Sequence, residues 1–337
     1  MVAPLEPLVL PADITVRSAL DRVFRLLSVG SKRFLTVKVD RSVTGMVAQQ
    51  QCVGPLHIPL ADVAVMAQSY IGVTGGATAI GEAPIKGLVD AAAGSAMAVG
   101  EAITNLMWAK VGSLEQVKCS ANWMWAAKLP GEGAAMFDAV KSMADTMVAL
   151  GVSVDGGKDS LSMAAKADGE MVKSPGTVTV SLYAACPDVT LTVTPDFKLP
   201  VDNGNTRVLF VDLSGGGVDT AARMGGSALA QVYNQLADVS PTVTVGEGTT
   251  ALKAAFTVTQ DLIERRMILA GHDRSDGGLI TTVLEVRATR RFTKLYSRST
   301  EYYIPALLEE WSTLYYRPLY YQLCIQCIFS VNPVIHR

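Results

Sequence analysis

The stretch DAAAGSAMAVGEAITNLMWAK, Asp90–Lys110, gives the clearest fold signal in the chain. It consists mostly of alanine and other small residues. Asp90 near its start and Lys110 near its end suit the two poles of a helix dipole, so the stretch predicts a helix. A second helix is predicted over Gly131–Leu150, with Gly151 as its stop signal. The apolar stripe expected on this second helix is Phe137, Val140, Met143, Ala144, Met147 and Leu150.

Shorter segments on either side of these helices alternate between strand and helix patterns. Strands are predicted at Arg33–Asp40, Asp62–Tyr70, Val178–Cys186 and Val208–Leu213, the last as a buried strand. Further helices are predicted at Ser18–Leu27, Ser227–Asn234 and Thr250–Arg266. Proline and glycine within Pro195–Asn205 indicate a linker, so the pattern as a whole favours an α+β protein with a division near residue 200.

The composition excludes several classes of protein. A net charge of −2 argues against nucleic-acid binding as the main activity, because that binding needs a basic surface. A hydrophobic content of 49% argues against disorder. Five sparse cysteines give no disulfide framework and favour a reducing, cytoplasmic setting. No signal peptide is visible, and the uncharged runs are interrupted by Pro, Gln and Gly, so we expect buried segments rather than membrane spans.

Several standard functional motifs are absent from the sequence or incomplete in it. DGGKDS, Asp155–Ser160, resembles a phosphate loop, but Val152 replaces the first glycine and Asp159 the final Ser/Thr. The G-x-G at Gly215 lacks the third glycine of a dinucleotide-binding fingerprint. No G-x-S-x-G is present, and the pair of cysteines at Cys324 has no second pair to complete a zinc site.

A set of oxygen ligands and glycine loops remains. Asp62 enters an apolar segment, Glu101 and Asn105 share one helix face at i and i+4, and Asp273 lies in GHDRSDGG. Carboxylates and an amide oxygen suit Mg²⁺. Backbone N–H groups of glycine pairs could cradle phosphates. The candidate pairs are Gly75–Gly76, Gly156–Gly157 and Gly277–Gly278.

Each feature also has a plainer interpretation. Glu101 and Asn105 could be a solvated helix face, and the glycine pairs could be ordinary turns. The aromatic cluster NWMW, Asn122–Trp125, could be core rather than a base-stacking platform. Cys119 could be a small buried hydrophobe rather than a nucleophile. The residues alone therefore support a magnesium–nucleotide site only weakly.

Longer strings carry a resemblance. They are DITVRSALDRVF from Asp13, GEAITNLMWA from Gly100, VKCSANWMWAAKLPGEG from Val117, GVSVDGGKDSLSMAA from Gly151 and GHDRSDGGL from Gly271. In this order they resemble the phosphoribosylformylglycinamidine synthase family in its large, single-chain form. The resemblance runs from about residue 13 to about residue 285.

The resemblance implies an α+β fold that covers the second of the family's two PurM-like repeats. The expected divisions are a remnant of the preceding repeat over 1–40, a PurM-like N-terminal domain over 41–194 and a linker over 195–206. A truncated PurM-like C-terminal domain over 207–285 and a divergent, poorly ordered tail over 286–337 follow.

The resemblance also implies chemistry. The family is a glutamine-dependent ligase that converts formylglycinamide ribonucleotide, ATP and glutamine to formylglycinamidine ribonucleotide, ADP, phosphate and glutamate. Asp62, Glu101, Asn105 and Asp273 match its magnesium ligands, and Ala61 and Ser275 match nucleotide contacts. This repeat is similar to a structural site that holds ADP and Mg²⁺. The cofactors implied are Mg²⁺ and ATP or ADP, and Asp155–Ser160 is expected in the wall of the synthetase cleft.

The chain departs from the family after Glu285, close to its last glycine, Gly278, and its last aspartate, Asp276. The first repeat and a glutaminase Cys–His–Glu set do not occur in it, so we expect the isolated chain to be inactive. Activity would need both of those parts as partners. The alternatives are a Mg–ADP-binding structural module without turnover and a truncated gene product without a stable function.

Overall fold

The computed structural model describes residues 4–36, 45–58, 60–198, 207–213, 223–287 and 326–331. Its largest element is a six-stranded sheet with the order β1-β2-β3-β8-β4-β5. The sheet is antiparallel apart from the β4–β5 pair, which is parallel. Its strands are β1 (Val47–Gln49), β2 (Ala64–Ala67), β3 (Gly75–Glu82), β4 (Lys118–Met124), β5 (Ser153–Ser160) and β8 (Thr177–Cys186).

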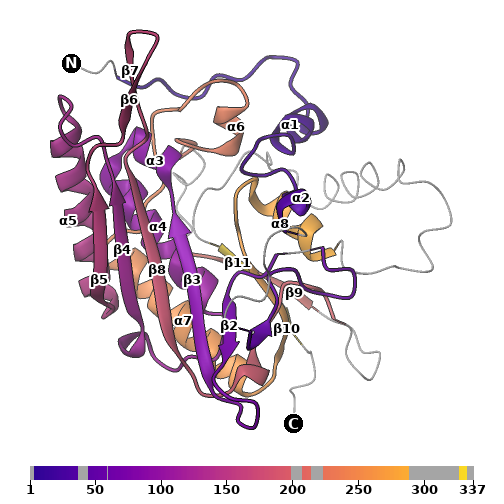
Figure 1. The fold of residues 1–337 in the computed structure, drawn as a ribbon. Coiled ribbons are helices and arrows are strands. Elements are labelled where there is room, and N and C mark those ends of the chain that lie inside the picture. Colours follow the sequence, from indigo (N-terminus) through magenta and orange to yellow (C-terminus); the bar gives the residue numbers. More distant parts are fainter. Residues whose placement is uncertain are drawn as a thin grey trace.

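Helices cover one face of this sheet (Figure 1). The two predicted long helices form as α4 (Ala91–Leu106) and α5 (Glu132–Leu150). The Asp90 side chain caps α4 by accepting from the amides of Ala92 and Ala93, and Gly151 ends α5 in the left-handed conformation. The parallel β4–β5 pair needs a crossover connection, which α5 provides.

Residues after the predicted linker form a second, three-stranded sheet with the order β10-β11-β9. It contains β9 (Arg207–Asp212), β10 (Ile268–Asp273) and β11 (Gln326–Val331). The helices of this part are α6 (Ala228–Gln231), α7 (Glu247–Glu264) and α8 (Gly278–Arg287). The remaining elements are α1 (Val16–Val23), α2 (Arg33–Thr36), α3 (Pro84–Val89), short 3-10 turns at Leu114–Gln116 and Val189–Leu191, and a hairpin of β6 (Ala164–Ala167) and β7 (Glu170–Lys173).

One hydrophobic cluster joins the two parts. It includes Ile103 and Leu106 of α4, Met147 of α5, and Leu252 and Phe256 of α7. Small residues let α4 lie close to β3, because a Cβ atom built on Gly81 would come within 2.1 Å of the Ala98 carbonyl oxygen. The alanine-rich composition of Asp90–Lys110 therefore serves close packing.

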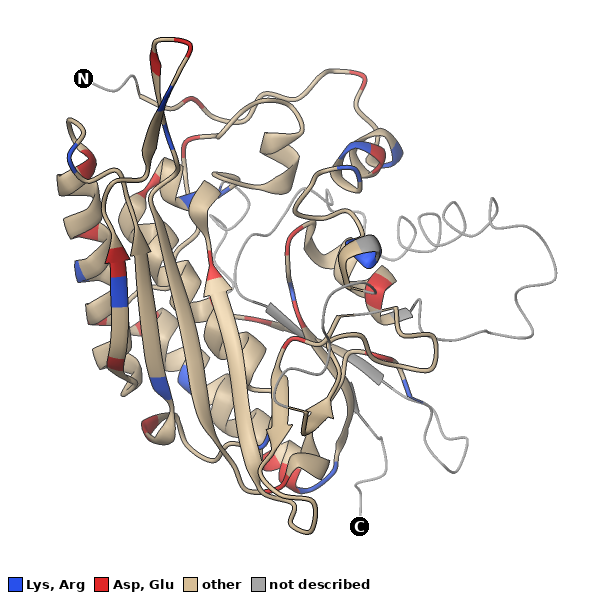
Figure 2. Ribbon diagram, in the orientation of Figure 1, with Lys and Arg blue, Asp and Glu red and all other residues tan. Residues whose placement is uncertain are grey.

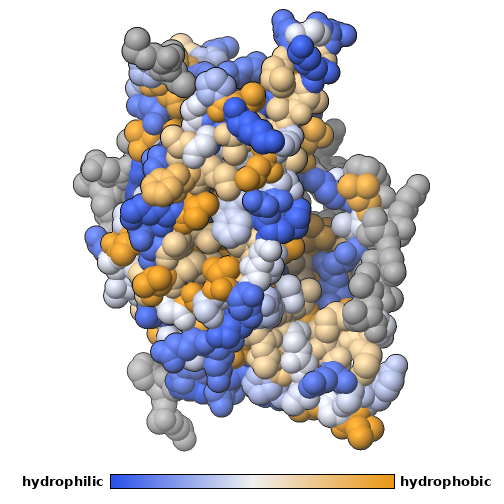
Figure 3. Space-filling model, turned by 60° about the vertical axis from the view of Figure 1, so that its left-hand side comes forward, coloured by the Kyte–Doolittle hydropathy of each residue, from blue (hydrophilic) through white to orange (hydrophobic). Residues whose placement is uncertain are grey.

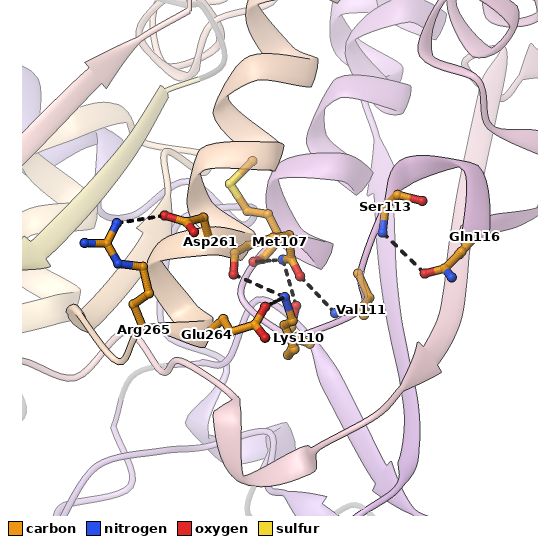
Figure 4. Close-up of polar contacts among 10 residues, drawn as sticks. Met107, Lys110, Val111, Ser113, Gln116, Asp261, Glu264 and Arg265 are labelled. Carbon is orange, nitrogen blue, oxygen red and sulfur yellow. Dashed lines mark hydrogen bonds and ion pairs between the residues drawn. The ribbon is translucent and has the colours of Figure 1, made fainter.

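The end of α4 is tied to α7 by hydrogen bonds. The Gln260 side chain donates to the carbonyl groups of Met107 and Ala109 and accepts from the amide of Val111, each at 2.9 Å. Figure 4 shows this region, where Lys110 also pairs with Glu264 at 2.6 Å. One buried glutamine thus bonds three backbone groups of the segment that directly follows α4.

Several sequence expectations were confirmed. The strand expected at Val178–Cys186 is β8, and the helices expected at Ser227–Asn234 and Thr250–Arg266 form as α6 and α7 with shifted ends. Cys119 and Trp125 are buried in the core, as the plainer interpretation of each predicted.

Other expectations were wrong. Arg33–Thr36 is helix α2 rather than the start of a strand, and residues 37–40 lie outside the described part. The Asp62–Tyr70 strand shrinks to β2, because the connection to β3 begins at Gln68, whose amide donates to the Thr74 carbonyl. β9 is not a buried strand, since Leu209 and Phe210 are both exposed.

Two of the predicted helices also need correction. On α5, Met143, Met147 and Leu150 are buried, while Phe137 and Ala144 are exposed because that side of the helix faces away from α4. The helix predicted at Ser18–Leu27 forms as α1 but ends at Val23, so Leu27 lies beyond it and is exposed.

The surface mixes charges and apolar groups. Lys and Arg alternate with Asp and Glu along α5 and β5 in Figure 2, in agreement with the net charge of −2. The face in Figure 3 shows apolar residues in small groups among polar ones. In the part of the chain that the structure describes, no helix is both long enough and apolar enough to cross a membrane.

Candidate functional site

Asp62 connects the two sheets. It lies two residues before β2, and its Oδ2 atom accepts a hydrogen bond from the backbone amide of Asp273 at 2.8 Å. Asp273 is the last residue of β10. The side chains of both acids are about 5% exposed. Two carboxylates that are 211 positions apart in the sequence are therefore buried side by side.

Glu101 and Asn105 of α4 lie at the free edge of β3. The partner strand β2 begins at Ala64, opposite Thr78, so β3 continues past its neighbour. There the Glu101 carboxylate accepts from the amide of Glu82 at 3.0 Å, and the Asn105 amide donates to the Ile80 carbonyl at 2.9 Å. The pair therefore caps a strand edge and is not a solvated helix face.

His272 is enclosed by three carboxylates. Its Nδ1 atom lies 3.0 Å from Asp62 and 3.3 Å from Asp273, and its Nε2 atom lies 3.3 Å from Glu285 of α8. One ligand atom each from Asp62, His272 and Asp273 fall within 4.8 Å of one another. We define Asp62, Glu101, His272 and Asp273 as the acid cluster, because Asp62 and Asp273 contact His272 and the charge of Asp273 acts on Glu101.

Burial perturbs the protonation of the acid cluster. Burial, and then the Asp273 carboxylate, raise the pKa of Glu101 from its usual 4.5 to about 8. Burial and the Asp62 carboxylate also raise the pKa of Asp273. Burial alone would lower the pKa of His272, but Asp62 and the other carboxylates outweigh it and raise this pKa well above its usual value. Crowded carboxylates of this kind are stabilised by a cation.

A cavity of about 380 Å³ opens beside the acid cluster. One wall is polar and includes Glu101, Asp273, Ser275 and the pair Gly277–Gly278. Both glycines have positive φ angles, of 92° and 79°, which favour glycine over residues with a side chain. Much of the remaining lining is apolar, and we call Val16, Leu20, Val23, Met224, Ala228 and Leu229 the apolar wall.

The donor set of the acid cluster fits magnesium. Three carboxylates supply the hard oxygen ligands that Mg²⁺ prefers. The Asn105 amide nitrogen is used by Ile80, which leaves its amide oxygen as the atom suited to a cation. The combination of a polar wall, a glycine pair and an apolar wall suits a ligand with phosphate groups at one end and a flat apolar group at the other.

The structure brings four of the six expected site residues together. Asp62, Glu101 and Asp273 form the cluster, and Ser275 lines the cavity. Asn105 lies one helical turn from Glu101 and does not line the cavity. Ala61 is placed by its amide bond to the Gln51 carbonyl and also lies off the cavity wall.

Two of the three glycine pairs are not loops. Gly75–Gly76 and Gly156–Gly157 lie within β3 and β5, where Gly75 and Gly157 permit close approach of the neighbouring strands. Asp155–Ser160 is therefore an exposed edge strand rather than a phosphate loop. Gly277–Gly278 alone among the pairs lines the cavity.

Sequence reasoning missed His272, Glu285 and Lys86. The signal for His272 was its position directly before Asp273, in the middle of a motif already singled out. Glu285 and Lys86 carried no local signal. Lys86 joins the site because α3 brings it to the cavity, where its charge acts on Glu101.

Comparisons with known proteins match most of the chain. A family model described as the FGAR-AT PurM_N-like domain matches residues 31–185. A probable phosphoribosylformylglycinamidine synthase of Arabidopsis thaliana is 57% identical over 281 residues, which are 83% of this chain and 19% of that protein. The human phosphoribosylformylglycinamidine synthase is 55% identical over 84% of this chain and 20% of its own length.

The chain belongs to the phosphoribosylformylglycinamidine synthase family. It spans about one fifth of the length of these curated relatives. Among solved structures, Thermotoga maritima PurL complexed with FGAR covers 95% of this chain and 46% of its own, with a TM-score of 0.56 and 12% identity. That likeness shows that this synthase-family chain has the PurL fold, an α+β architecture with a PurM-like N-domain.

Proposed function

We propose that this chain is a magnesium–nucleotide-binding unit of a phosphoribosylformylglycinamidine synthase. The observation that carries the proposal is the acid cluster beside a cavity whose rim contains Gly277 and Gly278. Family membership supports the ligase reaction, in which ATP and glutamine convert formylglycinamide ribonucleotide to formylglycinamidine ribonucleotide. Thermotoga maritima PurL has been solved complexed with ATP.

Asp62, Glu101 and Asp273 would hold the magnesium ion, with the Asn105 amide oxygen as a further ligand. Bound Mg²⁺ neutralises the charge of the nucleotide phosphates. Ser275 and the backbone of Gly277–Gly278 would face those phosphates. Ala61, next to Asp62, lies off the cavity wall, so it would contact only a part of the nucleotide that extends beyond the cavity toward Asp62. Lys86 and Arg274, which also line the cavity, add positive charge to it.

The apolar wall would receive the base. Val16 and Leu20 of α1 face the cavity together with Met224 and residues of α6. A flat base that leaves water for this wall gains hydrophobic contacts, which offset the loss of its freedom of motion. We therefore assign the phosphates to the polar wall and the base of the same nucleotide to the apolar wall.

On its own the chain would bind the nucleotide without turning it over. Its share of the relatives' length, about one fifth, is consistent with a unit that works together with further parts of the synthase. In this arrangement, bound Mg–ADP would support the structure of the synthase and would not be consumed in its reaction.

Isothermal titration calorimetry with ADP tests the proposal, with Mg²⁺ and then with a chelator in its place. We expect binding heat only with Mg²⁺, and its loss in Asp273→Asn. The matched control is Asp145→Asn, which removes an exposed acid of α5 that pairs with Lys141. Absence of Mg²⁺-dependent binding in the wild-type chain would overturn the proposal, and steady ADP release from ATP by the chain alone would overturn the claim that it does not turn over.

A further inference from the structure

The segment before the first sheet reaches across to α6. The Gln235 side chain accepts from the amide of Val9 at 2.9 Å and donates to the carbonyl of the same residue at 2.7 Å. A side-chain amide carries one acceptor and two donors, so it can pair with both backbone groups of a single residue. Gln235 therefore holds an extended backbone in the way that a neighbouring β-strand would.

A second contact lies close to the first. The Arg22 guanidinium of α1 sits over the ring of Tyr233, 5.1 Å from its centroid. This is a cation–π distance. Tyr233 and Gln235 both follow α6 directly, so one short stretch of chain holds both Val9 and α1.

The held segment is part of the cavity wall. Val16, Ala19, Leu20, Val23 and Ser28 all line it. A Cβ atom built on Gly277 would lie 2.8 Å from Val29, so the loop after α1 also touches the glycine pair on the polar wall. Residues 4–30, which we call the strap, thus border both the apolar and the polar side of the cavity.

We propose that Gln235 is a positioning residue that fixes the strap over the cavity and thereby sets how long a bound nucleotide stays. This rests on the proposed function, because it assigns the cavity to a nucleotide. The ligands of the acid cluster come from other elements, so release of the strap leaves the metal contacts in place. It removes apolar contacts to the base, and their loss speeds dissociation while association stays nearly the same.

The test compares four proteins: wild type, Gln235→Leu, Tyr233→Leu and Tyr233→Phe. Gln235→Leu keeps the size of the side chain but loses both hydrogen bonds to Val9. Tyr233→Phe keeps the ring under Arg22, so it is the conservative control for Tyr233→Leu. The first measurement is the rate of tryptic cleavage after Arg17, Arg22 and Arg25 in the nucleotide-free protein. The second is the dissociation rate of a fluorescent ADP analogue with Mg²⁺, measured by stopped flow.

We expect faster cleavage and an approximately tenfold faster dissociation in Gln235→Leu, which corresponds to about 1.4 kcal/mol. Tyr233→Leu should move both rates in the same direction, and Tyr233→Phe should match the wild type. The association rate and the Mg²⁺ requirement should not change, which separates positioning from general damage to the fold.

Three results would overturn the inference. Wild-type cleavage of Gln235→Leu would show that Gln235 does not hold the strap. Faster cleavage with an unchanged dissociation rate would show that the strap does not retain the nucleotide. Failure of the wild-type chain to bind Mg–ADP would contradict the proposed function and the claim about dwell time, while the cleavage rates would still decide whether Gln235 holds the strap.

Discussion

The carboxylate of Asp62 accepts a hydrogen bond from the backbone amide of Asp273 at 2.8 Å. This contact joins the approach to β2 with the end of β10 and so connects the two sheets. It also fixes the distance between two of the acids that we assign to magnesium. The same contact therefore serves the fold and the proposed site.

Replacement of Asp62 should separate these two roles. Asp62→Ala leaves the buried amide of Asp273 without its partner, so we expect a loss of about 1–3 kcal/mol in the free energy of unfolding. Asp62→Asn keeps an oxygen acceptor and should lose less stability, yet it removes the charge that binds Mg²⁺. Urea denaturation measures the first effect and calorimetry with Mg–ADP the second. Equal stability losses in the two variants would contradict this account.

The raised pKa of Glu101 predicts a pH dependence. Its pKa is about 8 in the folded protein against a usual 4.5, because burial and Asp273 disfavour the charged form. Folding therefore favours the protonated acid. The stability from this group is fully present below pH 4.5 and is lost as the pH rises to about 8. In the metal-free protein, the melting temperature of Glu101→Gln should rise relative to wild type between pH 5 and pH 8.

The same shift acts on metal binding with the opposite sign. Magnesium needs the deprotonated carboxylate, so the Mg–ADP affinity of the wild-type chain should increase from pH 6 to pH 8. A melting-temperature difference between wild type and Glu101→Gln that stays constant across this range would argue against a perturbed Glu101.

Gln260 should be a strong determinant of stability. Gln260→Ala leaves the buried carbonyl groups of Met107 and Ala109 and the amide of Val111 without their partner (Figure 4). We expect a loss of about 2–4 kcal/mol in the free energy of unfolding, since each unsatisfied buried group costs about 1–3 kcal/mol and water can reach some of them after truncation.

The matched control for Gln260 is Glu264→Ala in the same helix. It breaks the ion pair with Lys110, in which the Glu264 side chain is 67% exposed. The Lys110 side chain is only 14% exposed, but it keeps a hydrogen bond to the Gln260 carbonyl, so we expect a loss of about 1 kcal/mol. Similar losses from the two variants, measured by urea denaturation, would mean that the cap on α4 is not the main contact between α4 and α7.

Gly81 tests the close packing of α4 on β3. An added Cβ atom would come within 2.1 Å of the Ala98 carbonyl oxygen and 2.5 Å of the Ala102 amide nitrogen. Gly81→Ala should therefore push α4 away and lower the melting temperature by several degrees, as overpacking costs about 1–3 kcal/mol. Gly76→Ala lies in the same strand with its nearest atom at 3.9 Å and should have a small effect. A small effect at both positions would contradict the packing described here.

The sequence could predict the long elements because their signals are local. Asp90 caps α4 and Gly151 ends α5, and each was recognisable from its residue type and position. The strand predicted at Arg33–Asp40 failed because a short apolar run fits either a strand or a helix, and Arg33–Thr36 forms a helix. Phe137 fits the helical period but faces solvent, since only contact with α4 decides which side of α5 is buried.

The candidate site likewise combines features that local sequence predicts with features that depend on distant contacts. Glu101 and Asn105 share a face because of their spacing, and that could be predicted from helix geometry alone. This face covers a free edge of β3 because β2 begins only at Ala64, opposite Thr78. Local sequence patterns do not reveal where β2 begins. The enclosure of His272 by Asp62 and Glu285 likewise depends on contacts between distant segments.

A crystal structure of the protein with Mg²⁺ and ADP tests the central claim most directly. Our account predicts a magnesium ion bound by oxygen atoms of Asp62, Glu101 and Asp273 at about 2.1 Å. It also predicts nucleotide phosphates beside Gly277–Gly278 and the base against α1. Nucleotide bound elsewhere, or bound here with the metal away from these three carboxylates, would contradict it.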